Sequence, residues 1–143
     1  MTENVNIFTD GGARGNPGPA AIGAVIKTET GRVLHQLSRE IGIATNNEAE
    51  YLALVAALEY LSQTKNQLSL MSDSVINFFL DSRLVVNQVN GIFKIKNSRM
   101  REFLLKVREL EQIIPGKIIY QLIPRERNFE ADTLVNQALD KQL

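Results

Sequence analysis

The sequence predicts an α/β domain in which helices pack on a five-stranded mixed sheet, in the order βββ-α-β-α-α-β-α. Three short apolar segments separated by glycine-containing turns open the chain, which is typical of an antiparallel meander. Each of two later strand-like segments follows a helical segment, which is typical of parallel strands joined by right-handed crossovers. Because 143 residues is an ordinary size for one domain, we expect a single domain over residues 1–143.

The first three strands are predicted from apolar segments and turn residues. Val5–Thr9, with apolar Val5 and Ile7, predicts a strand, and Asp10–Pro19, with four Gly and two Pro, predicts a turn region. Two more strands are expected as an antiparallel hairpin, over Ala21–Thr28 and Val33–Ile41.

Cap residues mark the helices. Thr45, Asn46 and Asn47 supply the N-cap of a first helix that ends near Ser62. Val75–Leu80 is apolar apart from one asparagine and predicts a strand buried on both faces. The remaining expected elements are a short helix over Ser82–Val89, a long helix from Asn97 or Ser98 to Pro115-Gly116, a strand over Ile118–Ile123 and a last helix over Glu130–Leu139.

The composition excludes several classes of protein and site. Hydrophobic residues make up 44% of the chain, and no apolar run reaches the roughly 20 residues of a membrane helix, so we expect no membrane partner. The first ten residues lack the features of a signal peptide, and we expect a cytoplasmic monomer. With no cysteine and with His35 as the only histidine, thiolate sites and two-imidazole sites are excluded.

Charge is unevenly distributed although the net charge is zero. The balance is −4 over residues 1–81, +6 over residues 82–127 and −2 over residues 128–143. A basic segment between acidic flanks suits a polyanion bound beside a carboxylate-lined site, and a solvated helix face explains the same pattern.

Several carboxylates stand where the fold can bring them together. Asp10 follows the first strand and Asp81 the fourth, so parallel neighbouring strands would place both at one edge of the sheet. Each also suits a cap of the turn that follows it. Asp132 begins the last helix, where the helix dipole alone favours an acid, and Glu130 competes with it for a functional role.

Glu50 is the most informative acid. It heads an apolar stripe of the first helix that faces the sheet, formed by Ala53, Leu54, Ala57, Leu58 and Leu61. A carboxylate at that place requires helix N–H groups, a basic partner or a metal ion. Glu48, in the first turn, is expected to interact with the helix dipole, and Glu59 is expected on the solvent-exposed surface.

Carboxylates that converge without His or Cys form an oxygen-only site, which favours Mg²⁺ or Mn²⁺ over zinc or copper. Because like charges repel, a divalent cation is needed to keep all of them ionised. Two such ions, bound together with substrate, would activate water and stabilise the leaving oxygen of an in-line phosphoryl displacement.

Four segments of the chain resemble type 1 ribonuclease H. They cover most of the chain in the order of that family, and the conjunction of TDGGARGNPGP with TNNxxE and LDS makes the resemblance specific. The segments are FTDGGARGNPGPAAIGAVI (Phe8–Ile26), TNNEAEYLALVAALEYL (Thr45–Leu61), FLDSRLVVNQVNG (Phe79–Gly91) and PRERNFEADTLVNQAL (Pro124–Leu139).

The resemblance implies a ribonuclease H-like fold and a metal-dependent endonuclease. The expected substrate is an RNA/DNA hybrid, whose RNA strand is cleaved to leave 5′-phosphate and 3′-hydroxyl ends, and double-stranded RNA stays open as a second substrate. The resemblance assigns metal binding and catalysis to Asp10, Glu50, Asp81 and Asp132. The TNNxxE spacing selects Glu50 over Glu48, as the apolar stripe does.

The resemblance also implies contacts with nucleic acid. Gly11, Asn16, Asn46 and Asn47 fall where the family contacts the backbone, sugars and minor groove of the hybrid. A 2′-hydroxyl that only RNA carries is what such groups can detect. Thr45 falls where the family grips a phosphate of the DNA strand. Turn formation and helix capping explain the same residues, and both roles can hold together.

The sequence departs from the family in three places. Many members carry a histidine in the loop before the last acid, whereas this loop has none. Arg125 stands there instead, and we expect it to be catalytic, with an ion pair to Glu126 or Glu130 as the alternative. Arg83 replaces a minor-groove glutamine and is an expected nucleic-acid contact. Only Gly91–Asn97 lies where many members have a basic protrusion.

Two functions of other classes are weighed against a nuclease. A catalytically silent nucleic-acid-binding module on the same fold is the first, because a fold does not determine a function. It would gain nothing from a carboxylate cluster that repels phosphate. An aspartyl-phosphate phosphatase is the second, but that chemistry usually needs another Asp two residues after the first, and position 12 is Gly.

Overall fold

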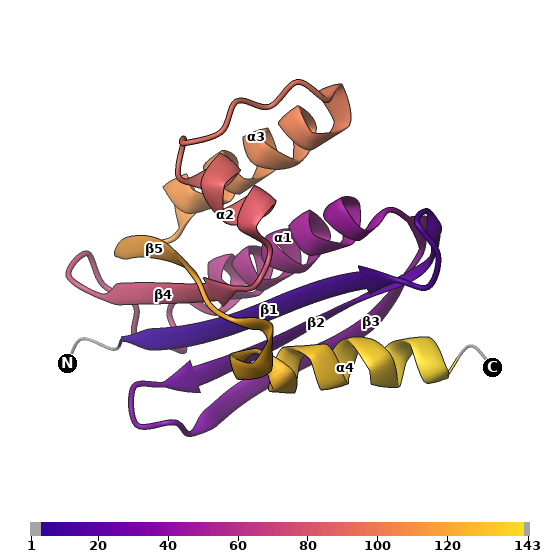
Figure 1. Ribbon diagram of the computed structural model, residues 1–143. Coiled ribbons are helices and arrows are strands. Elements are labelled where there is room, and N and C mark those ends of the chain that lie inside the picture. The colour runs from indigo at the N-terminus through magenta and orange to yellow at the C-terminus, as the bar shows by residue number, and fades with distance from the viewer. Residues whose placement is uncertain (1–3, 142–143) are drawn as a thin grey trace.

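The structure is a computed structural model that describes residues 4–141. Its five strands form one sheet in the order β3-β2-β1-β4-β5 (Figure 1). The strands are β1 (Val5–Ala13), β2 (Gly18–Thr28), β3 (Val33–Ala44), β4 (Val75–Leu80) and β5 (Lys117–Leu122). The helices are α1 (Asn46–Thr64), α2 (Arg83–Val89), α3 (Ser98–Ile113) and α4 (Phe129–Asp140), and a 3-10 turn, η1 (Arg125–Arg127), precedes the last of them.

The sheet is mixed, as the element order predicts. β1 pairs antiparallel with β2, and β2 pairs antiparallel with β3. β4 is parallel to both of its neighbours, β1 and β5. Parallel neighbours need crossover connections, and here helices supply them before β4 and before β5. The predicted fold class is confirmed.

Helices cover both faces of the sheet (Figure 1). α1 packs on β1 and β2, with α2 and α3 packed against α1 on the same side. α4 lies on the opposite face, where it packs on β2 and also contacts β1 and β3. None of the helices within residues 4–141 has the length and apolar character needed to cross a membrane.

α1 lies at the centre of the core. Its N-terminus is closed by a capping box between Thr45 and Glu48, which satisfies helix N–H groups that have no partner within the helix. The stripe from Glu50 to Leu61 is buried against the sheet, as its spacing predicts. The same spacing that buries leucines therefore also buries a carboxylate.

β1 is longer than the sequence predicts, because Asp10–Ala13 continue the strand and pair with β2. The predicted turn over Asp10–Pro19 is wrong at both ends, and only Arg14–Pro17 remains outside the strands. Gly11 serves a close approach of β1 to α1: a Cβ atom there would lie 2.2 Å from the carbonyl carbon of Ala49. Glycine-rich sequence here marks tight packing of a strand against a helix.

The prediction that β4 is buried on both faces is also wrong. Ile76, Phe78 and Leu80 are fully buried, but the alternate residues Val75, Asn77 and Phe79 are only partly buried. α4 packs over β2, two strands away, so it leaves the second face of β4 partly open. The apolar sequence of this strand therefore did not show whether one face of the strand or both faces are buried.

Replacement of Gly11 by alanine tests the close approach of β1 and α1. Gly11→Ala is expected to lower the free energy of unfolding by about 3 kcal/mol, because the helix backbone has to move away from the new methyl group. Gly12→Ala is the matched control, since its Cβ atom would meet only Val135 Cγ1 at an ordinary 3.6 Å. Its effect should stay within about 1 kcal/mol. Equal urea-unfolding curves for the two variants would contradict this account.

Candidate active site

The parallel pairing of β1 with β4 brings two carboxylates to one edge of the sheet. Phe8 pairs with Phe79 at the end of this register, so Asp10 and Asp81 each lie two residues beyond the pair. Asp10 is still inside β1, held by its pairing with Gly23 of β2, rather than just beyond the strand as predicted. The predicted shared edge is confirmed by the strand register.

Glu50 reaches the same edge from the first turns of α1. The backbone N–H of Gly11 donates a hydrogen bond to Glu50 Oε1 at 3.1 Å, which links β1 to the helix. Glu50 and Asp10 are each only 7% exposed. Because Gly11 lacks a side chain, the strand comes near enough for its amide to meet a buried carboxylate.

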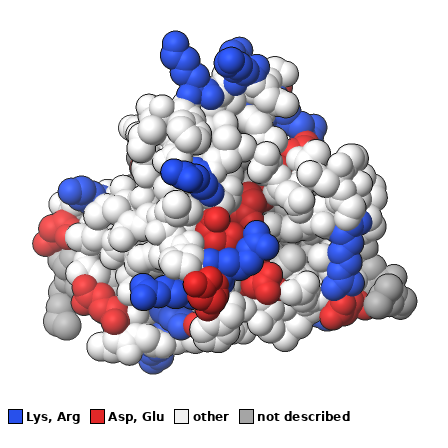
Figure 2. All heavy atoms as spheres, in the orientation of Figure 1, with Lys and Arg blue, Asp and Glu red and all other residues white. Residues whose placement is uncertain are grey.

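Three carboxylates form a compact cluster. One oxygen each of Asp10, Glu50 and Asp81 lies within 4.8 Å of the other two. Asp132, in the first turn of α4, lines the same cavity of about 340 Å³. Glu130 does not line this cavity and instead forms an ion pair with Lys27, which resolves the competition between the two acids of that turn. Acidic side chains gather near the middle of the face shown in Figure 2.

Burial dominates the electrostatics of this cluster. The pKa of Asp10 is raised to about 7, first by burial and also by the nearby charges of Asp81 and Asp132, while a hydrogen bond with Glu50 acts in the opposite direction. The pKa of Glu50 lies well above its usual range, first because of burial and then because of Asp10 and Asp81. The Gly11 N–H acts in the opposite direction but does not offset these effects. The pair therefore favours either a bound proton or a bound cation.

The residues fit a divalent cation. Glu50 Oε2 is buried and receives no hydrogen bond from any described residue, although it lies in the carboxylate cluster. A buried, unpartnered oxygen is costly unless a ligand satisfies it. The donor set is oxygen only, which suits a hard cation.

Asn128 is a site residue that the sequence analysis did not single out. Its side chain is fully buried, and Nδ2 donates to the backbone oxygen of Thr9 at 2.8 Å and to Asp81 Oδ2 at 3.0 Å. Asn128 thereby fixes the Asp81 carboxylate to β1, next to Asp10. In the sequence, its position just before the last helix indicates only a helix N-cap and gives no sign of the contact with Asp81.

The expected nucleic-acid contacts fall into two groups. Gly11, Asn46 and Asn47 line the cavity, whereas the exposed Arg83 and the N-cap residue Thr45 do not. Asn16 does not line the cavity itself, but it is linked to the cavity-lining group because its Oδ1 accepts the backbone N–H of Asn46 at 3.0 Å. Asn46 Oδ1 in turn accepts the backbone N–H of Ala13 at 2.9 Å. The loop after β1 and the start of α1 are therefore one hydrogen-bonded unit.

Arg125 lines the cavity from η1 and is exposed. It forms no ion pair with any residue of the range 4–141, and Glu130, one of its two expected partners, pairs with Lys27. Arg14 and Asn136 also line the cavity and were not predicted. Arg14 is held by Asp140, with 2.6 Å between its Nη2 and Oδ1 of the acid.

Stability without metal should fall as the pH rises. A carboxyl group whose pKa is raised in the folded state binds its proton more tightly there than in the unfolded chain. The stabilisation is complete below the unfolded-state pKa near 3.8 and is lost as the pH rises through about 7. In EDTA, Asp10→Asn should therefore exceed the wild type in unfolding free energy by about 2 kcal/mol at pH 8 and by much less at pH 5.

Urea unfolding at both pH values measures this difference. Glu59→Gln is the control, because it removes an exposed carboxylate elsewhere on α1 and should follow the wild type at both values. An Asp10→Asn effect that is the same at pH 5 and pH 8 would show that the buried charge does not destabilise the fold.

Comparison with known proteins agrees with the motifs and the fold. A family model described as "Reverse transcriptase-like" matches residues 8–138. Ribonuclease HI of Halobacterium salinarum is 38% identical over 136 residues, which are 95% of this chain and 64% of that protein. The bifunctional protein Rv2228c of Mycobacterium tuberculosis is 39% identical over 95% of this chain, but the match spans only 35% of its length.

Solved structures of similar sequence share the whole fold. LC11-RNase H1, isolated from compost by a metagenomic approach, superimposes with a TM-score of 0.88 at 43% identity and covers 97% of both chains. The same protein in complex with an RNA/DNA hybrid gives a TM-score of 0.87 over 97% of this chain and 99% of that one, at 42% identity. Since sequence motifs, the family model and the fold agree over nearly all of its length, this chain belongs to the type 1 ribonuclease H family.

Proposed function

We propose that this protein is a divalent-metal-dependent endoribonuclease that cleaves the RNA strand of RNA/DNA hybrids. The observation that carries the proposal is the cluster of Asp10, Glu50 and Asp81 at an open cavity, in which one buried oxygen of Glu50 has no hydrogen-bond partner among the described residues. The complex of LC11-RNase H1 with an RNA/DNA hybrid supports the choice of substrate. The products expected are 5′-phosphate and 3′-hydroxyl ends.

Asp10, Glu50, Asp81 and Asp132 would hold the metal, which we propose to be Mg²⁺, with Mn²⁺ as a substitute. Two ions bound with substrate would supply an activated water and stabilise charge on the leaving oxygen. The protein itself keeps these carboxylates in place: the Gly11 N–H holds Glu50, and a buried asparagine amide holds Asp81. Burial of Asp10 and Glu50 lowers the effective dielectric around them, which strengthens the attraction of the site for a cation.

Selection of RNA is proposed to come from the unit that joins the loop after β1 to the start of α1. Gly11, Asn46 and Asn47 line the cavity, and Asn16 is hydrogen-bonded to the backbone of Asn46. Amide and carbonyl groups at this place can detect the 2′-hydroxyl that distinguishes RNA from DNA. Double-stranded RNA offers the same group and is the second substrate to compare.

A catalytically silent binding module is the alternative on this fold. A site meant only to hold nucleic acid would place cationic side chains, not a cluster of carboxylates, against phosphate. Burial that raises the pKa of Asp10 and Glu50 costs stability when they are ionised, and that cost is useful only if a cation binds there.

Nuclease assays on Asp10→Asn test the proposed function. The wild type is expected to cleave labelled RNA/DNA hybrid with Mg²⁺ and not with EDTA, and to leave duplex DNA intact. Asp10→Asn should reduce cleavage about 10³-fold or more, because the amide keeps the shape but removes a metal-binding charge. Hybrid binding and the fold should persist. Glu59→Gln should cleave as the wild type does. An Asp10→Asn variant that cleaves at nearly the wild-type rate would disprove the metal mechanism.

Arg125 is proposed to contact a phosphate at the site through its planar guanidinium. It cannot act as a base near neutral pH, because arginine stays protonated. Arg125→Ala should lower turnover by about one to three decades, and Arg125→Lys should restore only part of it, since a point charge lacks the fork. Arg127→Ala is the matched control, because Arg127 belongs to the same 3-10 turn but does not line the cavity. Unchanged turnover in Arg125→Ala would make Arg125 an ordinary surface charge.

A further inference from the structure

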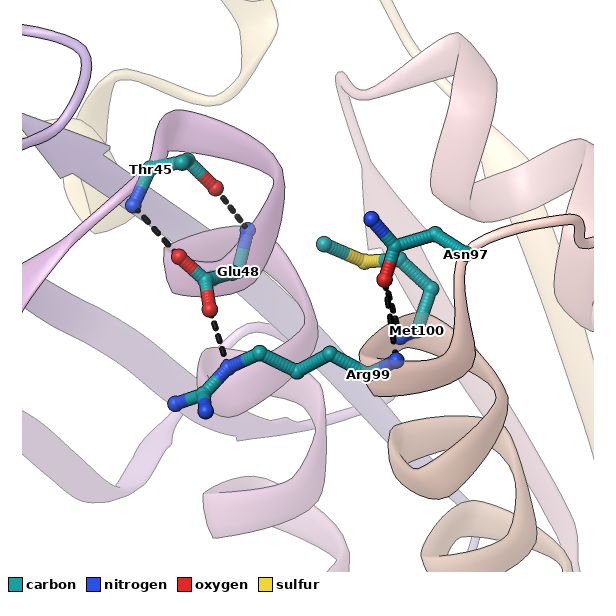
Figure 3. Close-up of polar contacts among 5 residues, drawn as sticks. All are labelled: Thr45, Glu48, Asn97, Arg99 and Met100. Atoms are coloured by element: carbon teal, nitrogen blue, oxygen red, sulfur yellow. Dashed lines mark hydrogen bonds and ion pairs between the residues drawn. The ribbon is translucent and has the colours of Figure 1, made fainter.

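One carboxylate joins the N-termini of α1 and α3 (Figure 3). In the capping box of α1, the Glu48 N–H donates to Thr45 Oγ1 at 3.1 Å, and the Thr45 N–H donates to Glu48 Oε1 at 2.8 Å. The other oxygen of the carboxylate, Oε2, forms an ion pair with Nε of Arg99, in the first turn of α3. Glu48 therefore uses one oxygen to cap its own helix and the other to hold an arginine of the neighbouring helix.

Arg99 is held from several directions. Asn97 Oδ1 accepts the backbone N–H groups of Arg99 at 2.9 Å and of Met100 at 3.2 Å, which fixes the start of α3. The guanidinium lies over the ring of Phe103, with Cζ 5.5 Å from the ring centroid. Because Nε is taken by Glu48, the orientation of the planar group is determined.

The outer edge of this guanidinium is free to bind a ligand. The Arg99 side chain is 62% exposed, and its Nη atoms form no hydrogen bond with any described residue. Figure 3 shows them extending away from Asn97. Two N–H donors on the edge of an arginine match two oxygens of one phosphate group. The arrangement therefore offers a phosphate-binding edge that is already oriented.

The surroundings of Arg99 are basic. The segment of residues 94–101 contains four cationic side chains, and none of its residues is acidic. All four side chains are exposed: Lys94, Lys96, Arg99 and Arg101. Figure 2 shows Lys and Arg side chains standing out over the end of the molecule that α2 and α3 form in Figure 1. A nucleic-acid backbone is the ligand that this charge pattern favours.

We propose that Glu48 is a positioning residue for substrate binding, which holds the Nη edge of Arg99 toward a phosphate of the bound hybrid. The proposal rests on the proposed function, because it takes the RNA/DNA hybrid as ligand. It makes a prediction that simple charge repulsion does not: loss of the negative charge at Glu48 weakens binding of a polyanion.

Glu48→Gln separates this role from helix capping. Glutamine serves as well as glutamate at the third position of a capping box, so the cap of α1 persists while the ion pair with Arg99 is lost. Affinity for the hybrid is measured in an Asp10→Asn background, which prevents cleavage, over a series of salt concentrations. Glu48→Gln is expected to weaken binding about 3–10-fold, as expected for losing one oriented charge-assisted contact.

Arg99→Ala should weaken binding to a similar degree. It should also make the slope of log affinity against log salt shallower by about 1, the amount expected for the loss of one phosphate contact. The double variant Glu48→Gln/Arg99→Ala should bind no more weakly than Arg99→Ala alone, because both changes remove the same contact. Glu102→Gln is the matched control: it removes an exposed carboxylate from the same helix, three residues after Arg99, and should leave affinity unchanged or slightly raised.

Affinity of Glu48→Gln equal to or greater than that of its parent would overturn the positioning role. So would a lower melting temperature with unchanged affinity, because Glu48 would then act only as a cap. If Arg99→Ala leaves the salt dependence of affinity unchanged, Arg99 does not contact a phosphate. If the parent protein itself fails to bind the hybrid, the proposed function falls as well, whereas the other outcomes overturn this inference alone.

Discussion

The burial of two carboxylates side by side between β1 and α1 is the constraint on which the rest of the site depends. Asp10 and Glu50 are almost completely enclosed, and within residues 4–141 only one of their four oxygens, Glu50 Oε1, accepts a backbone N–H. In a protein that binds no cation, such a pair would lower the free energy of unfolding with no compensating interaction. The fold tolerates the pair because a cation, or a proton in its absence, neutralises charge that the core cannot.

The strand and the helix that carry these acids approach each other closely because Gly11 has no side chain. Gly11 lets β1 approach Ala49 so closely that a methyl group would collide with the helix. The parallel register of β1 and β4 then places Asp81 beside Asp10. Asn128 joins Asp81 to the backbone of β1, so a residue that binds no metal in this scheme still decides where a ligand oxygen lies.

Opposite charges are separated along the molecule in a way that suits a polyanionic substrate. Carboxylates concentrate at the proposed metal site, while the basic residues 94–101 lie just before and at the start of α3. Glu48 stands between these regions. Its pKa lies below the usual range, first because the backbone N–H of Thr45 bonds to it and also because of Arg99, so it stays ionised at neutral pH. The cap of α1 is thereby joined to Arg99, the side chain that we propose as a phosphate contact.

The sequence by itself determined the fold class, the element order and three of the acids that converge. The i, i+3, i+4 spacing of α1 predicted the burial of Glu50, because helix periodicity depends only on local geometry. The positions of Asp10 and Asp81 after two apolar strands predicted a shared edge, because the element order favours parallel pairing of those strands. Position in the last helix left Glu130 as a competitor of Asp132, although the resemblance assigned Asp132. In the structure Asp132 lines the cavity, and Glu130 pairs with Lys27, about one hundred positions away in the chain.

Other features depended on contacts between distant segments and were decided only by the tertiary structure. The continuation of β1 through Ala13 needs β2 as a partner, and the half-open face of β4 results from where α4 packs. The hold of Asn128 on Asp81 and of Glu48 on Arg99 joins residues about fifty positions apart. A local pattern reports which side of an element is apolar, but the identity of the neighbour across that side is set by how the whole chain folds.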